Sequence, residues 1–205
     1  IGAYNNGSGR GHARVYEYSS GSWSQLGSDI DGEVAGDNAG WSISLDTDGD
    51  VVAIGSPAHA SNKGTVRIYG YSSNSWSKLG ADIDGEASND YFSYGYGSIA
   101  LDSDGDRVAI GGYLNDGGAT DAGYVEVYEY SSGSWSQLGS DINGESSYDF
   151  SGWSVSLDSD GDRLAVGAFA NDGGGSDAGH VRIYGYSSGS WSQLGSDIDG
   201  ESSSD

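Results

Sequence analysis

Cysteine and methionine are absent from this 205-residue chain, proline occurs once, at Pro57, and basic residues are few. Without cysteine there are no disulfides and no thiolate chemistry, so cysteine usage does not identify the redox compartment. Eight Lys and Arg stand against 31 Asp and Glu, which gives a net charge of −23. Such a surface repels phosphate, so we expect no nucleic-acid partner. Apolar runs are also too short for membrane insertion.

Repetition is what the sequence has in abundance. Residues 152–168 read GWSVSLDSDGDRLAVGA, and two related copies carry the same Leu-Asp pair, so that Leu45, Leu101 and Leu157 are 56 residues apart. A second unit, of the type VRIYGYSSGSWSQLGSDIDGE, follows each copy and also precedes the first. This second unit recurs at residues 14–33, 67–86, 126–145 and 182–201. A period of this length decides the fold, because each unit is too small to bury a core alone.

Each repeat has the pattern of short β-strands joined by tight turns. Trp41, Ile43 and Leu45 alternate with serines, an acidic turn follows, and helical periodicity is absent. Four strands in roughly 56 residues predict an all-β chain of β-propeller blades, each made of four antiparallel strands. A β-solenoid is the alternative, but its coils are shorter and lack successive hairpins.

The repeats divide the chain into about three and a half blades, which form one propeller-type domain or part of one. The predicted units are a half blade with its junction at residues 1–39 and complete blades at residues 40–95, 96–151 and 152–205. Because Ile1-Gly2-Ala3 matches residues 166–168 inside a repeat, we expect the chain to be a piece of a larger protein. Open first and last sheets would leave apolar area in water, so we expect further blades or copies of the chain as partners.

The repeat resembles the FG-GAP repeat of integrin α-chain-like β-propellers, in its bacterial and algal variant. The long phrase LDSDGDRLAVGA, then GHVRIY, then WSQLGSDIDGE carries the resemblance. The Phe-Gly of the family falls at Ser151-Gly152, and its Gly-Ala-Pro falls at Gly167-Ala168-Phe169. The resemblance implies a propeller, usually seven-bladed, in extracellular or cell-surface proteins that bind or adhere to other molecules.

The same resemblance implies calcium sites in the turn between the first two strands of each blade. The matching residues are Asp46, Asp48, Asp50, Asp102, Asp104, Asp106, Asp158, Asp160 and Asp162. Three carboxylates with carbonyls and water would supply the six to eight oxygens that Ca²⁺ takes. Gly49 and its equivalents come earlier than in the family pattern, however, and Asp-Gly is also the signature of a tight hairpin. The hairpin interpretation is favoured, and calcium is an optional cofactor with none required.

Two further features depart from the repeat. Tyr91, Tyr94 and Tyr96 form a cluster in the one unit that lacks the tryptophan found at positions 41 and 153. These rings are candidates for stacking on a sugar, but repacking around the missing tryptophan is the favoured interpretation. Asn6 begins the sequon Asn-Gly-Ser, a glycosylation acceptor only in a secreted eukaryotic protein.

No set of residues with a catalytic pattern breaks the repeat. The G-x-S-x-G match at residues 185–189 lies in an expected β-hairpin, whereas a nucleophile elbow joins a strand to a helix. His12 and His180 share a repeat position that Thr65 and Tyr124 fill elsewhere. We therefore expect no enzyme.

Strand parity predicts two acidic faces. The blade junctions carry a recurring Asp-Ile-(Asp/Asn)-Gly-Glu segment, at residues 29–33, 82–86, 141–145 and 197–201, which we call the DI(D/N)GE segment. These segments should share one face with the loops at 115–123 and 171–179, and the Asp-Gly-Asp turns should lie on the other face. The resulting hypothesis is a non-enzymatic, extracellular structural or adhesive propeller module whose acidic loops meet a protein or glycan at the cell surface. A lectin-like propeller and a calcium-dependent adhesion module are the alternatives.

Overall fold

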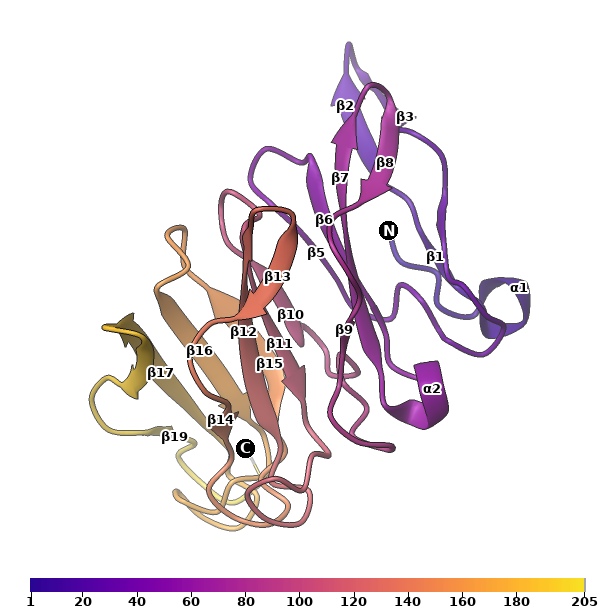
Figure 1. Cartoon of the computed structure of the whole chain (residues 1–205). Helices are drawn as coiled ribbons and strands as arrows, with labels where there is room; N and C mark the ends of the chain where they lie inside the picture. The colour runs from indigo at the N-terminus through magenta and orange to yellow at the C-terminus, as the bar shows by residue number, and fades with distance from the viewer. Residues whose placement is uncertain (205) are drawn as a thin grey trace.

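The structure, a computed structural model, describes residues 1–204. Antiparallel sheets stand side by side in chain order, from an N-terminal half blade through three complete blades (Figure 1). We call residues 40–95 blade one, residues 96–151 blade two and the described residues from 152 onward blade three. The all-β propeller architecture predicted from the repeat is confirmed.

The strands have the same order in every complete blade. The half blade contains β1 (His12–Ala13), β2 (Tyr16–Ser19), β3 (Ser22–Gln25) and β4 (Ile30–Asp31). Blade one contains β5 (Ile43–Leu45), β6 (Val51–Ser56), β7 (Thr65–Ser72), β8 (Ser75–Lys78) and β9 (Ile83–Asp84). Blade two contains β10 (Ile99–Leu101), β11 (Arg107–Gly112), β12 (Tyr124–Ser131), β13 (Ser134–Gln137) and β14 (Ile142–Asn143). Blade three contains β15 (Ser151–Leu157), β16 (Arg163–Ala168), β17 (His180–Ser187), β18 (Ser190–Gln193) and β19 (Ile198–Asp199).

Each complete blade has a short fifth strand that the four-strand prediction does not include. The DI(D/N)GE segment, expected as a junction turn, pairs with the start of the third strand of its own blade. In blade one, Asp84 lies opposite Thr65, and Ile83 lies opposite Val66. The junction therefore satisfies backbone groups that a loop would leave to water.

The outer hairpins close through two-residue turns with left-handed backbone. Ser20 and Gly21 connect β2 to β3 with φ values of 52° and 85°. Two successive positive φ angles define the turn type whose twist matches antiparallel strands. Two four-residue segments, α1 (Asn6–Gly9) and α2 (His59–Asn62), also contain left-handed residues. Within the described residues, no helix is long and apolar enough to cross a membrane.

The core lies between consecutive blades. Ile68, Val108 and Ile110 belong to one cluster that joins blade one to blade two, and all three are fully buried. Val127 and Leu164 belong to a second cluster, which joins blade two to blade three. Each sheet thus buries its apolar face against its neighbour, which is how a twisted sheet stack is stabilised.

A tryptophan on the fourth strand ties each blade to the preceding one. The Nε1–H groups of Trp76, Trp135 and Trp191 donate to the carbonyl oxygens of Leu26, Leu79 and Leu138 at 2.8, 2.9 and 2.8 Å. The same indole packs over a glycine of the preceding blade, so a Cβ at Gly80 would lie 3.0 Å from the Trp135 ring. The repeat therefore carries its own inter-blade contact.

The first sheet leaves apolar surface open. Ile43 of β5 is 40% exposed, whereas its equivalent in blade two, Ile99, is 4% exposed. A cavity of about 740 Å³ lies beside it, lined by Ile1, Val15 and Trp23 among others. Exposed apolar area is the feature from which we expect further blades or copies, and that association stays a prediction.

The inter-blade tryptophan gives a first test. Trp135→Phe keeps a ring but removes the N–H donor, and we expect it to lower the free energy of unfolding by about 1 kcal/mol. Trp135→Ala also removes the packing and should cost about 3 kcal/mol. Urea unfolding measures both.

Trp23→Ala is the matched control, because Trp23 holds the same repeat position but is exposed. It should change stability by less than about 0.5 kcal/mol. Equal losses for Trp23→Ala and Trp135→Ala would show that the tie to the preceding blade contributes nothing.

Candidate functional site

Six aromatic rings form an unbroken row across the half blade and the three complete blades. Tyr4 contacts Trp41, Trp41 stacks on Tyr94, and the row continues through Tyr113 and Trp153. We call these five residues and Phe169 the aromatic belt. The successive ring centroids are 4.5, 4.3, 5.7, 4.9 and 5.0 Å apart. These separations are typical of directly interacting aromatic pairs.

The repeat places the belt residues where the first strand begins and the second strand ends. Trp153 lies in β15, Trp41 lies two residues before β5, and Tyr113 and Phe169 directly follow the ends of β11 and β16. Because the first two strands are antiparallel, both positions meet at one end of each sheet. Blades two and three each contribute two rings, whereas blade one contributes Trp41 alone, since Pro57 holds its second position.

The belt is accessible to solvent. Tyr4 and Phe169, at its ends, are exposed, and the rings between them are half-buried. Tyr96 projects beside Trp153 with 77% of its surface exposed, and Tyr148 adds another exposed ring next to Phe150. A groove of about 390 Å³ begins at Trp153 and Phe169 and runs toward β19. A row of rings with exposed ends beside a groove makes this end of the sheets a candidate binding surface.

A tyrosine takes the place of the missing tryptophan in blade two. The backbone N–H of Tyr94 donates to Tyr91 as that of Trp41 donates to Asn38 and that of Trp153 to Phe150. Tyr94 therefore occupies the tryptophan position. Gly95–Gly97 is a three-residue insertion that carries Tyr96 outward.

Of the predicted cluster of Tyr91, Tyr94 and Tyr96, only the first two are in contact with each other. Tyr91 lies against Tyr94, with ring centroids 5.3 Å apart, whereas Tyr96 contacts Trp153 instead. Burial, and after it the neighbouring Tyr94, raises the pKa of Tyr113 to about 12, so this ring is uncharged at neutral pH. The sugar-stacking role of these tyrosines stays a prediction.

Most of the belt escaped the sequence analysis. Three of the four Gly-Ala-Pro positions carry an aromatic residue in place of proline, namely Tyr4, Tyr113 and Phe169. This replacement of proline by aromatic residues was the sequence signal for the belt. The sequence pattern within one repeat does not show that these rings meet those of the next blade.

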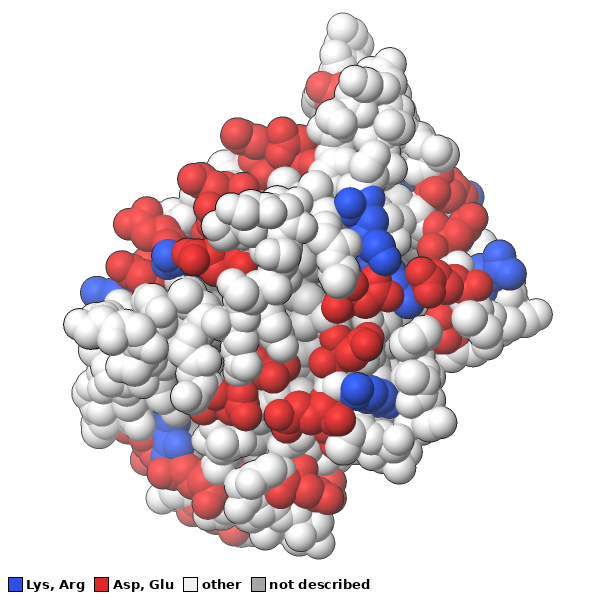
Figure 2. Space-filling model, in the orientation of Figure 1, with Lys and Arg blue, Asp and Glu red and all other residues white. Residues whose placement is uncertain are grey.

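Acidic side chains cover much of the surface and include residues in the loop that follows Tyr113. Figure 2 shows Asp and Glu spread over the visible face, with few Lys and Arg. Loop residues Asp116 and Asp121 follow Tyr113, and burial raises the pKa of Asp121. The loop backbone is fixed, because Asp116 accepts a hydrogen bond from the backbone N–H of Asp121 at 2.8 Å.

The Asp-Gly-Asp turns line a second hollow, of about 280 Å³. In each turn the first aspartate caps the backbone: Asp102 Oδ1 accepts from the N–H groups of Asp106 and Arg107, both at 3.1 Å. Neighbouring turns are joined, because Ser103 donates from its N–H to the carbonyl of Ser159 at 3.2 Å. This capping is the behaviour of a hairpin turn. Calcium binding at these turns stays a prediction.

Three other clusters bring metal-ligating atoms within 4.8 Å of one another among the described residues. All three combine a third-strand residue with carboxylates of the DI(D/N)GE segments. They are His12 with Asp29 and Asp31, Glu145 with His180 and Asp197, and Glu86 with Glu126 and Asp141. In the second cluster a guanidinium already satisfies the carboxylates, since Arg182 pairs with both Glu145 and Asp197.

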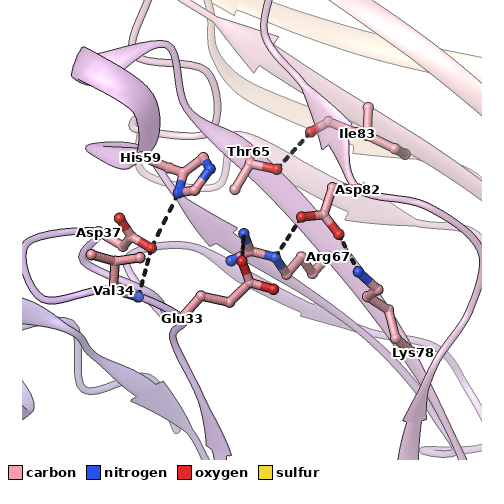
Figure 3. Close-up of polar contacts among 9 residues, drawn as sticks. All are labelled: Glu33, Val34, Asp37, His59, Thr65, Arg67, Lys78, Asp82 and Ile83. Atoms are coloured by element: carbon pink, nitrogen blue, oxygen red, sulfur yellow. Dashed lines mark hydrogen bonds and ion pairs between the residues drawn. The ribbon is translucent and has the colours of Figure 1, made fainter.

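Asn6 lies in α1 and is exposed, as a glycosylation acceptor must be. His59 makes a contact that the sequence did not suggest: its Nδ1 lies 3.1 Å from Asp37 Oδ2 (Figure 3). In the equivalent contact between blades two and three, Asn171 Nδ2 donates to Asp149 Oδ2 at 2.9 Å. This histidine is therefore part of a structural contact between loops.

The aromatic belt and the Asp-Gly-Asp turns lie at opposite ends of the strands. The repeat that builds both is similar to a repeat of a known family. A sequence model of the FG-GAP repeat matches residues 143–184. This segment is an FG-GAP repeat. It begins in the last strand of blade two and runs through the first three strands of blade three. No curated protein matches the chain in sequence.

Solved structures share the propeller fold of this chain at low identity. A protein described as a 6-phosphogluconolactonase from Bacteroides uniformis is 12% identical with a TM-score of 0.64, over 97% of this chain and 51% of its own. The β-propeller domain of the Trilobed protease from Pyrococcus furiosus is 12% identical with a TM-score of 0.52, over 96% and 53%. The chain thus spans about half the length of these structures. Such identities establish the fold and no activity.

The acidic turns give a pH test. Burial, with Asp106 nearby, raises the pKa of Asp102 to about 6 from the ordinary value of 3.8. Between these two values the folded chain keeps a proton that the unfolded chain releases, so this group lowers stability as pH rises from 4 to 6. Asp102→Asn keeps the capping oxygen but cannot ionise.

We therefore expect Asp102→Asn to gain stability relative to the unmodified chain as pH rises from 4 to 7. Urea unfolding with chelator present, at both pH values, measures the difference. A difference independent of pH would show that Asp102 titrates normally.

Proposed function

We propose that the chain is a non-enzymatic adhesive β-propeller module that works outside the cell and binds neutral glycans along the aromatic belt. The observation that carries this proposal is the unbroken row of six rings with exposed ends. A row of this kind offers several sites to one extended ligand, and each contact needs only modest strength.

The chemistry of the belt favours a carbohydrate. The ring face of a sugar presents C–H groups, which pack on aromatic faces, and its hydroxyls point to the polar rim around them. The acidic loops beside Tyr113 supply hydrogen-bond acceptors for such hydroxyls. With a net charge of −23, the surface repels sulfated or uronic-acid glycans and accepts neutral ones.

A role without catalysis is supported by the placement of the serine motif. Strand β17 ends at Ser187 and β18 begins at Ser190, so the G-x-S-x-G match forms the tip of a hairpin. A nucleophile elbow instead needs a helix after the turn. The resemblance of the repeat to integrin-like FG-GAP propellers supports the extracellular location.

A neutral-glycan array tests the belt. We expect the chain to bind, and we expect Tyr96→Ala and Phe169→Ala to weaken binding at least tenfold each, because each removes an exposed stacking surface. The thermal midpoints should stay within a few degrees, since both side chains are exposed.

Tyr18→Ala is the matched control, because Tyr18 is an exposed tyrosine that packs on Trp23 in an outer hairpin. Its glycan affinity should equal that of the unmodified chain. Binding that survives both Tyr96→Ala, beside the belt, and Phe169→Ala, within it, or no binding to any neutral glycan, would remove the proposal.

A further inference from the structure

Arg67, a buried arginine of blade one, bridges two acidic segments. Arg67 Nη2 lies 2.9 Å from Glu33 Oε2, and its Nε lies 2.8 Å from Asp82 Oδ2 (Figure 3). Glu33 belongs to the half blade and Asp82 to blade one. One guanidinium therefore neutralises two carboxylates and joins two neighbouring units, as its fork of donors allows.

Blade three repeats this arrangement. Arg182 pairs with Asp197 of its own blade at 2.8 Å and with Glu145 of blade two. The half blade keeps part of it, since Arg14 pairs with Asp29 at 2.7 Å. This repeat position therefore carries an arginine in the half blade, in blade one and in blade three.

Blade two has a carboxylate where the others have the arginine. Glu126 lies opposite Ile110 in the sheet, the register that Arg67 has opposite Ile54 and Arg182 has opposite Val166. The two acidic partners are retained, as Glu86 from blade one and Asp141 from blade two. Their oxygens and that of Glu126 lie within 4.8 Å of one another.

No basic side chain replaces the lost guanidinium. Glu126 is 4% exposed and has no ion pair among residues 1–204. Its one hydrogen-bond donor is the hydroxyl of Tyr128, at 3.2 Å. Burial first, and then Asp141, raises the pKa of Glu126 to about 8. Three carboxylates in one place without a cation are unfavourable, because like charges repel and burial removes water.

A second, independent feature points into the same place. Tyr124 lies two residues before Glu126 on β12, so both side chains are on one face of the strand. It is fully buried, and its hydroxyl has no hydrogen-bond partner among the described residues. In blade three the residue at the same strand position, His180, has a ring nitrogen within 4.8 Å of Glu145 and Asp197 oxygens, which are the counterparts of Glu86 and Asp141. A buried hydroxyl without a partner calls for a ligand or water beside it.

We propose that Glu86, Glu126 and Asp141 bind a divalent cation of the calcium type, which takes the place of the arginine found in the other blades. All three ligands are hard oxygens, the donors that Ca²⁺ and Mg²⁺ use and that zinc sites with Cys and His do not. Ca²⁺ accepts several protein carboxylates in a flexible geometry, whereas Mg²⁺ keeps several waters, so a site of three carboxylates favours calcium.

The neighbouring residues hold the ligands and leave an entry. Asn115 donates from Nδ2 to Glu86 at 3.2 Å and to Asp90 at 2.9 Å. Gln137 donates to Asp141 Oδ1 at 2.6 Å. Glu86 itself is exposed, which gives an ion a path from solvent.

The ion would join blade one to blade two. Glu86 comes from the junction of blade one, and the other two ligands come from blade two. Arg67 and Arg182 make the corresponding contacts permanently, whereas this one depends on the calcium concentration. The site is separate from the Asp-Gly-Asp turns and uses none of their residues.

Calorimetry and thermal unfolding of the whole chain, first freed of metal with chelator, test the site. We expect calcium to bind with a dissociation constant on the order of 0.1 mM, the range of extracellular modules, and magnesium to bind more weakly. At about 50 times that concentration the thermal midpoint should rise by roughly 5 °C.

Glu126→Arg is the decisive variant, because it rebuilds the arrangement of the other blades. It should abolish this binding event, and without calcium it should melt at a higher temperature than the unmodified chain. Glu126→Gln should weaken binding at least tenfold without that gain. Asp158→Ala, in an acidic turn, is the control and should retain the event.

Two results would overturn the proposal. One is a metal-free chain whose heat signal and thermal midpoint do not respond to calcium. The other is a Glu126→Arg isotherm that superimposes on that of the unmodified chain, which would place any calcium elsewhere.

Discussion

The packing of each sheet against the next is the interaction on which the whole molecule depends. A single four-stranded blade has two apolar faces and no partner of its own, so its core forms only between neighbours. Val108 and Ile110, fully buried between blades one and two, and Leu164, buried between blades two and three, show where that core lies. The tryptophan on each fourth strand adds a hydrogen bond across the same interface. Everything functional in the chain is built from contacts that this stacking brings together.

Repetition makes departures from the pattern informative. Where blades one and three keep an arginine between two carboxylates, blade two has Glu126, and the surrounding residues still follow the repeat register. A lone substitution in a nonrepeating protein would have no such internal reference. Here the arginines of the neighbouring blades show which charge this position carries elsewhere, and the proposed cation would restore that charge.

The aromatic belt arises in a different way, from residues that each look ordinary. From the sequence pattern, Tyr113 is one more tyrosine at a strand end, and Trp153 is predicted to be a core residue of a first strand. Antiparallel pairing places Trp153 and Phe169 at the same end of one sheet, and the packing of blade three on blade two places Tyr113 beside Trp153.

Sequence alone determined the repeat length, the all-β propeller class and the hairpin character of the acidic turns. These follow from alternation and turn chemistry, which act over a few residues. It did not show that Tyr94 fills a tryptophan position, that the DI(D/N)GE segments pair as fifth strands, or that Glu86, Glu126 and Asp141 meet. Those facts were decided by tertiary structure, because residues 40 and 15 positions apart in the chain become neighbours only when one sheet packs on another. The local pattern specified each blade, and the packing of blades decided which side chains face each other.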